Sequence, residues 1–200
     1  MDYTKSLSER TQRLKPSGIR KFFDLLDEMK DVVSLTVGQP DFVTPWHIRE
    51  AAIESLDKGR TYYTSNSGLL ELREAVSEYL ERRFGLNYEA KNEIIVTVGG
   101  SEAIDLAVRA LVNPGDEVLY PNPGFPIYES QIQFQGATAV PYGFVPGETN
   151  FLLDFDAIER SITPSTRAII FNNQHNPTGA VSPREEIEAL AELCIRHDLY

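Results

Sequence analysis

Two spacings of apolar residues alternate along this chain. Short aliphatic or aromatic runs, at Ile94–Val98, Glu117–Tyr120 and Arg167–Phe171, predict buried strands. Between them, apolar residues recur every three or four positions, which predicts helices that pack on one face. Strands that alternate with helices favour a mostly parallel sheet with right-handed crossovers. We therefore expect an α/β fold of three layers, α/β/α. The predicted helices begin near Pro45, Leu69, Ser101, Ile127, Asp156 and Ser182.

The first residues follow a different pattern. Residues 1–31 are polar with short apolar patches, which predicts an arm and then a short helix over about Ile19–Leu26. Val32–Val37 reads as a strand that runs into a turn at Gly38. Further along the chain, the sequence of residues 142–153 predicts a loop. Ser182 to Glu185 predicts a capping box with Pro183 at the first helical position.

Charge and composition limit the classes of molecule that we expect this protein to bind. The formal net charge is −11, and the acidic excess lies after residue 60. This argues against nucleic acid or an anionic membrane as the main partner. No apolar run approaches the length of a membrane span, and the start lacks a signal-peptide pattern, so we expect a cytoplasmic protein. The single cysteine, Cys194, excludes an internal disulfide, and three scattered histidines predict no metal site.

The stretch from Val96 to Ala103 carries the strongest chemical signal. An apolar run leads into Gly99 and Gly100, and a helical pattern follows from Ser101. Glycines let a ligand approach the backbone, and the helix end directs unpaired N–H groups and a positive dipole toward it. The stretch therefore predicts an anion site, most plausibly for a phosphate. Two alternatives stay open, because Ser101 fits a simple helix N-cap as well as the nucleophile of a serine hydrolase.

Two further loops follow predicted strands. Pro121 to Pro126 has three prolines around Phe125, and Asn172 to Gly179 has no aliphatic side chain. Because ligands bind at the carboxyl ends of parallel strands, we expect these loops and Gly99–Ser101 to form one site. Amides, a hydroxyl, an aromatic ring and carboxamides suit a planar phosphorylated ligand. A dinucleotide site would need a third glycine and a later acidic residue, and both are missing. A hydrolase would need His175 or His197 beside Ser101.

Five separated motifs stand in a fixed order along the chain. They are Gly38-x-Pro40-Asp41-Phe42, Tyr63 with Gly68-x-x-Glu71-Leu72-Arg73, Val98-Gly99-Gly100-Ser101-Glu102-Ala103, Pro121-x-Pro123-x-Phe125-x-x-Tyr128, and Asn176-Pro177-Thr178-Gly179. In order and spacing they resemble the motifs of the class I and II aminotransferases, which are pyridoxal-phosphate enzymes of fold type I. The resemblance runs from about Ser8 to Tyr200 and covers the N-terminal half of that fold.

The resemblance implies a role for each of eight residues. Gly100, Ser101 and Glu102 would surround the phosphate of pyridoxal 5'-phosphate, Phe125 would stack on its ring, and Asn176 would bind its phenolic oxygen. Gly38 and Ile19 would contact the substrate. Tyr63 would reach the cofactor phosphate of a partner subunit, which implies a homodimer. The substrates would be an amino acid and a 2-oxo acid.

The resemblance also implies a domain division and an incomplete site. Residues 1–44 would form the N-terminal arm and a small-domain segment, and residues 45–200 the first part of the cofactor-binding large domain. The family's Schiff-base lysine lies beyond the matched region, and the six lysines present occupy polar stretches outside the three loops. We therefore expect no catalytic residue in this chain and no transamination by it alone. The alternative is a non-catalytic or complementing fragment. A serine hydrolase that uses Ser101 is less favoured.

Overall fold

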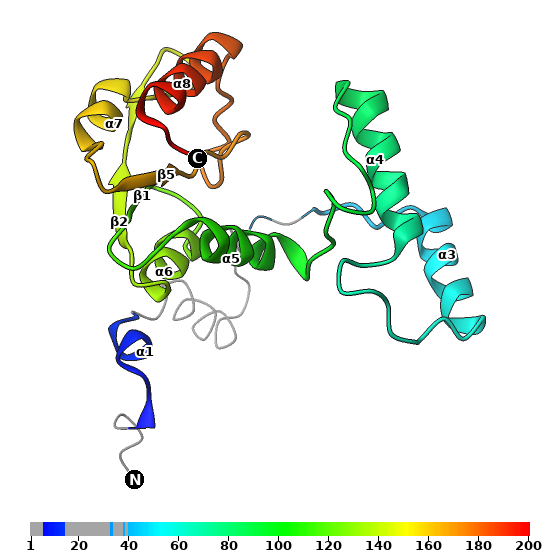
Figure 1. Ribbon diagram of the computed structural model, residues 1–200. Helices are drawn as coiled ribbons and strands as arrows, with labels where there is room; N and C mark the ends of the chain where they lie inside the picture. The colour runs from blue at the N-terminus through cyan, green and yellow to red at the C-terminus, as the bar shows by residue number, and fades with distance from the viewer. Residues whose placement is uncertain (1–5, 15–32, 34–37, 39) are drawn as a thin grey trace. The chain divides into compact units, whose positions relative to one another are not determined.

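The computed structural model describes residues 6–14, 33, 38 and 40–200 (Figure 1). It divides into two compact units, which we treat separately. The sheet unit contains Met1–Ser17 and Gly99–Tyr200, and the helical unit contains Gly18–Val98.

Three parallel strands form the centre of the sheet unit. They are β1 (Glu117–Pro121), β2 (Thr138–Tyr142) and β5 (Thr166–Ile169), in the order β2-β1-β5. Leu119 of β1 pairs with Val140 on one side and Ile169 on the other. The central strand is consequently the most buried, and its carboxyl end is flanked by the carboxyl ends of both neighbours.

Helices cover both faces of this sheet. Helices α5 (Gly99–Leu111) and α6 (Ile127–Phe134) lie on one face, and α7 (Phe155–Ser161) and α8 (Arg184–His197) lie on the other (Figure 1). Adjacent residues of β1 point to opposite faces, so Val118 packs under α5 and α6 while Leu119 packs under α7 and α8. Both are almost fully buried. The expected three-layer α/β fold with a mostly parallel sheet is confirmed.

Local signals placed most helices correctly, but two predicted caps are wrong. Helix α6 starts directly after Pro126, as predicted. The spacing Asp156-x-x-Glu159 predicts a cap at Asp156. The N-cap of α7 is instead Asp154, whose carboxylate accepts the N–H of Ala157 at 2.9 Å. Pro183 is the N-cap of α8, without a side-chain hydrogen bond, so Ser182 does not form the predicted capping box.

Residues 142–153 are not the loop that the sequence suggested. β3 (Phe144–Pro146) and β4 (Phe151–Leu153) form a short antiparallel pair. The carboxylate of Glu186 in α8 accepts the N–H of Leu153 at 2.7 Å. This buried bond joins the hairpin to α8, and Glu186 is buried together with Leu190 and Leu193. The helical spacing predicts that Ile187, Leu190, Ala191 and Cys194 line the buried face of α8. Leu190 is buried and Cys194 is half-buried, as predicted, whereas Ile187 and Ala191 are exposed.

The helical unit contains α3 (Trp46–Asp57) and α4 (Leu70–Phe84). Gly85 ends α4 with φ +70°, which supports the predicted stop at this glycine. Arg73 of α4 is buried and donates through Nη1 to the carbonyls of Ala90 and Lys91 at 2.7 and 2.9 Å. This bond network fixes the segment after α4. No described residue of α3 is buried.

The predicted strand Ile94–Val98 is wrong for the part of the chain described here. These residues form no ladder, and Val98 is 89% exposed. The N–H of Val96 donates instead to the carbonyl of Ser67 at 3.0 Å. A strand needs a neighbouring strand with which it forms a ladder of backbone hydrogen bonds, and residues 94–98 belong to none of the described ladders.

The ends of the sheet unit add two observations. A short helix, α1 (Glu9–Arg13), lies within the predicted arm, contacts α6 and is capped by the hydroxyl of Ser8. At the other end, Tyr200 pairs with β5: its N–H donates to Arg167 at 3.2 Å and its carbonyl accepts from Ile169 at 2.9 Å. These two bonds place the backbone of Tyr200 alongside β5. The predicted helix Ile19–Leu26 and most of the predicted strand Val32–Val37 lie outside the described residues.

None of the helices in the described part of the chain is both long enough and apolar enough to cross a bilayer.

Candidate functional site

The amino end of α5 lies at the carboxyl edge of the sheet. Helix α5 packs on the sheet through Val108, and a short turn at its end leads into the amino end of β1. The helix therefore runs antiparallel to β1. Its 13 residues span about 20 Å, comparable to the roughly 17 Å of the five-residue strand. The first turn of α5 is thus level with the carboxyl ends of β1 and β5.

The first turn of α5 has an open backbone. The helix begins at Gly99, which has φ +75°, a conformation that favours glycine. An ideal Cβ at Gly100 would meet no atom within 4 Å. Ser101 is half-buried in the first turn, so it is not the N-cap of the helix, and that alternative is wrong. Glu102 is exposed, and it makes an interaction of its own.

The loop after β1 holds Phe125 in one orientation. Gly124 approaches the backbone so closely that a Cβ would lie 2.1 Å from the carbonyl oxygen of Pro121. Phe125 is half-buried, and its ring meets that of Tyr128 edge to face, with centroids 5.8 Å apart. The N–H of Tyr128 donates to the carbonyl of Phe125 at 3.1 Å. The ring of Phe125 is therefore held, half-buried, at this edge of the sheet.

The loop after β5 is braced by its own polar side chains. The side-chain oxygen of Asn172 accepts the N–H of Asn176 at 2.8 Å, and that of Asn173 accepts the N–H of Ser182 at 3.1 Å. Asn176 itself is exposed. The backbone of Asn176 is thus fixed while its carboxamide remains accessible.

Tyr142 connects the ends of all three strands. Its carbonyl accepts the N–H of Asn122 after β1 at 2.8 Å, and its hydroxyl donates to the carbonyl of Ile170 after β5 at 2.8 Å. The side chain is 2% exposed, and burial raises the pKa of the phenol well above its usual value. Sequence analysis missed this residue, because nothing in its local pattern distinguishes it from other aromatic strand residues.

Five of the eight predicted site residues share this edge, and three do not lie in the described part of the sheet unit. Gly100, Ser101 and Glu102 lie on α5, and Phe125 and Asn176 follow β1 and β5. Gly38 and Tyr63 belong to the helical unit, where both are exposed. Ile19 lies outside the described residues.

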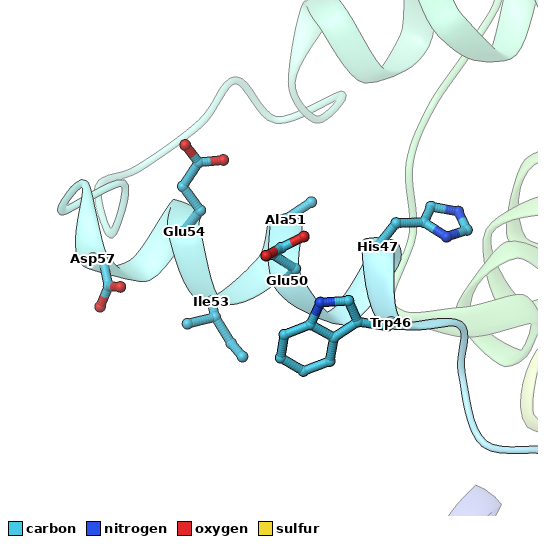
Figure 2. A pocket seen from close by; sticks show the side chains of 7 residues that line it. All are labelled: Trp46, His47, Glu50, Ala51, Ile53, Glu54 and Asp57. Carbon is cyan, nitrogen blue, oxygen red and sulfur yellow. The ribbon is translucent and has the colours of Figure 1, made fainter.

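A shallow concavity lies on the helical unit, and it lacks the chemistry of a site. Its volume is about 560 Å³ and its lining comes entirely from α3. Figure 2 shows the side chains that line it. Its polar lining is acidic, from Glu50, Glu54 and Asp57, with Trp46 beside them (Figure 2). One exposed helix face cannot enclose a ligand or exclude water. None of the predicted site residues lines it.

The hydrolase alternative has no geometric support in the described residues. His175 contacts Thr178 through Nδ1 at 2.8 Å, and His197 lies 3.8 Å from the carboxylate of Glu159 at the end of α8. Neither imidazole bonds to Ser101, so the described sheet unit contains no serine–histidine pair.

Comparisons with known proteins agree with the geometry. Residues 30–200 match the family model "Aminotransferase class I and II". The chain is 41% identical to aromatic-amino-acid aminotransferase 2 of Thermococcus litoralis, over 97% of this chain and 50% of that protein. It is 42% identical to aspartate/prephenate aminotransferase of Thermus thermophilus, over 98% of this chain and 51% of that protein.

Solved structures show the same similarity. N-succinyldiaminopimelate aminotransferase from Mycobacterium tuberculosis superposes with a TM-score of 0.90 at 36% identity, over 96% of this chain and 50% of that one. This chain spans about half the length of the relatives it matches. The matched region includes all three loops at the carboxyl edge of the sheet. The chain therefore belongs to the class I and II aminotransferase family.

Proposed function

We propose that the protein containing this chain is a pyridoxal-phosphate-dependent aminotransferase that transfers an amino group between an amino acid and a 2-oxo acid. The observation that carries the proposal is the open first turn of α5, which lies at the same sheet edge as the loops of Phe125 and Asn176. When bound, pyridoxal phosphate supplies the electron-withdrawing ring on which amino groups are exchanged.

The residues present fit this cofactor. The first turn of α5 has open space at Gly100 and the positive end of the helix dipole, which suits the phosphate. The half-buried hydroxyl of Ser101 adds a donor there. Phe125 offers one ring face for stacking, worth about 0.5 to 1.5 kcal/mol, and the helix end adds about 0.3 to 2 kcal/mol. The accessible carboxamide of Asn176 would donate to the phenolic oxygen.

We propose two further contacts from the helical unit and the arm. The backbone at Gly38, with Ile19, would bind the substrate. The exposed phenol of Tyr63 would reach the phosphate in a partner subunit of a homodimer. We propose from the family that residues 1–44 form the arm and a small-domain segment and that residues 45–200 form the first part of the large domain. We propose from the composition that the protein is cytoplasmic.

We also propose that the 200-residue chain by itself does not transfer amino groups. None of the three loops contains a lysine, and of the lysines that the structure describes, Lys58 pairs with Glu54 and Lys91 is exposed. A complementing role is the alternative to a complete active site in this chain. Amino transfer should then be absent for the chain alone and appear after mixing with the family's C-terminal half. Turnover by the chain alone would contradict this.

Equilibrium dialysis tests cofactor binding. The chain should bind pyridoxal 5'-phosphate about 2- to 30-fold more tightly than pyridoxal, because only the former engages the helix end. Ser101→Ala should reduce that ratio. Ser165→Ala, at the opposite end of the sheet, is the matched control and should leave the ratio unchanged. Equal binding of both compounds by the unaltered chain would reject the proposed phosphate site.

A further inference from the structure

The loop that carries Asn176 is closed at its base by backbone hydrogen bonds. The N–H of His175 donates to the carbonyl of Ala180 at 2.8 Å, and the N–H of Gly179 donates to the carbonyl of His175 at 2.7 Å. His175 and Ala180 are buried, whereas Asn176 between them is exposed. The position of the Asn176 carboxamide therefore depends on what holds the two sides of this base, at His175 and at Ala180 with Val181.

The β3–β4 hairpin contacts both sides of the base. The ring of Phe144 packs on the imidazole of His175, with centroids 4.5 Å apart and planes inclined at 50°. The side-chain amide of Asn150 donates through Nδ2 to the carbonyl of Val181 at 2.7 Å. Phe144 is the first residue of β3, and Asn150 lies in the turn before β4. The hairpin therefore holds the base of the loop at two separate points.

The hairpin is itself fixed to the sheet unit. Phe144 pairs with Leu153 across the two short strands, and the N–H of Leu153 donates to the carboxylate of Glu186 in α8 through a buried bond of 2.7 Å. The ring of Phe144 also meets that of buried Tyr142, with centroids 6.0 Å apart. Because its own end is anchored in the core, the hairpin can restrain the more exposed loop beside it.

We propose that Phe144 and Asn150 are positioning residues, through which the hairpin directs the carboxamide of Asn176 toward the phenolic oxygen of the cofactor. Their contacts with the loop stand on the structure, and the consequence for the cofactor rests on the proposed function. Phe144 packs with the core cluster under α7 and α8, whereas α5 covers the opposite face of the sheet. Loss of either contact should therefore weaken the contact with the phenolic oxygen and spare the contact with the phosphate.

Two analogues of the cofactor read these contacts separately. Pyridoxal lacks the phosphate, and 3-deoxypyridoxal 5'-phosphate lacks the phenolic oxygen. In equilibrium dialysis, the unaltered chain should prefer pyridoxal 5'-phosphate over the 3-deoxy analogue by about 2- to 10-fold, the effect of one hydrogen bond. Phe144→Leu and Asn150→Ala should move this ratio toward one and leave the preference over pyridoxal unchanged. An unchanged first ratio, or an equal loss of both, would overturn the positioning role.

Matched variants come from the same hairpin. Phe151→Leu makes the same change at an aromatic residue of β4 that is 46% exposed, and Thr149→Ala changes the exposed residue beside Asn150. Both should leave both ratios unchanged. Phe144→Tyr keeps the ring on His175 and should keep the preference that Phe144→Leu loses. Equal effects of Phe144→Leu and Phe151→Leu, or no rescue by Phe144→Tyr, would reject the role of the ring contact.

Amide hydrogen exchange tests the hold on the loop without any cofactor. In Phe144→Leu and Asn150→Ala, the amides of His175 and Gly179 should exchange about 2- to 10-fold faster than in the unaltered chain. The amide of Ile170, which bonds to β1, should keep its rate. Unchanged exchange in the loop, or an equal rise at Ile170, would show that the hairpin does not specifically hold the loop.

The outcomes distinguish this inference from the proposed function. If the unaltered chain does not bind pyridoxal 5'-phosphate but the loop amides respond as expected, the proposed cofactor is wrong and the hold of the hairpin on the loop stands. If the unaltered chain prefers pyridoxal 5'-phosphate over pyridoxal and neither variant changes the loop amides, the positioning role is wrong and the proposed function stands.

Discussion

The hydroxyl of Tyr142 donates a hydrogen bond of 2.8 Å to the carbonyl of Ile170, 28 residues further along the chain. It joins the carboxyl end of β2 to the segment after β5, across the central strand β1. The loops after β1 and β5 therefore both start beside one buried residue, which bonds to Asn122 through its backbone carbonyl and to Ile170 through its hydroxyl.

Tyr142→Phe removes this bond while keeping the ring. We expect the free energy of unfolding to fall by about 1 to 2 kcal/mol, because the Ile170 carbonyl loses its donor in a buried place. Urea titration followed by circular dichroism measures it. Tyr62→Phe is the control, since Tyr62 is 70% exposed and should change stability little. A loss of stability of the same size in both variants would contradict a stabilising hydrogen bond between Tyr142 and Ile170.

Alkaline pH should destabilise the fold through the same residue. Burial raises the pKa of Tyr142 above the value of about 10 that it has when unfolded, so above pH 10 the unfolded chain releases a proton that the folded chain retains. This contribution is fully present below pH 10 and falls by about 1.4 kcal/mol per pH unit above it. The stability difference between the unaltered chain and Tyr142→Phe should therefore shrink between pH 10 and 11. A constant difference would be inconsistent with a buried phenol.

The two glycines of α5 should respond oppositely to alanine. Gly99 has φ +75°, where an L-residue costs about 1 to 2 kcal/mol, so Gly99→Ala should lower stability. Gly100 has open space and no positive φ, so Gly100→Ala should leave stability unchanged or raise it by up to about 1 kcal/mol. Thermal unfolding compares the pair. Similar losses in both variants would show that the helix does not begin as described.

Gly124→Ala should disturb the loop that holds Phe125. The added Cβ would lie 2.1 Å from the Pro121 carbonyl oxygen, so the backbone must move, at a cost of about 1 to 3 kcal/mol. Binding of pyridoxal 5'-phosphate should weaken with it. Gly143→Ala is the matched control, because nothing lies within 4 Å of its Cβ position. Unchanged stability in Gly124→Ala would refute this close approach.

The sequence predicted those elements whose signals are local. Pro126 and Gly85 mark helix ends, and α6 and α4 begin or end beside them. The strand Ile94–Val98 failed because a strand depends on a partner that no local pattern reports. The β3–β4 hairpin was missed because its strands are three residues long and lie among glycines and prolines.

The residues of the candidate site likewise fall into those that a local sequence pattern predicted and those that it did not. Ser101, Phe125 and Asn176 were found because each stands in an unusual loop after an apolar run. Tyr142 and Glu186 were not found, since their importance comes from burial against segments distant in the sequence. The pairing of Asn172 with Asn176 leaves a sequence signal, two asparagines four residues apart, that was available but not used.

Amide NMR during titration with pyridoxal 5'-phosphate tests the central claim, that three loops of this chain form one cofactor site. We expect the amides of Gly100, Phe125 and Asn176 to shift together, with one dissociation constant, and inorganic phosphate to shift only the α5 signals. Shifts confined to the helical unit, different dissociation constants for the three loops, or no saturable shift at all would contradict the account.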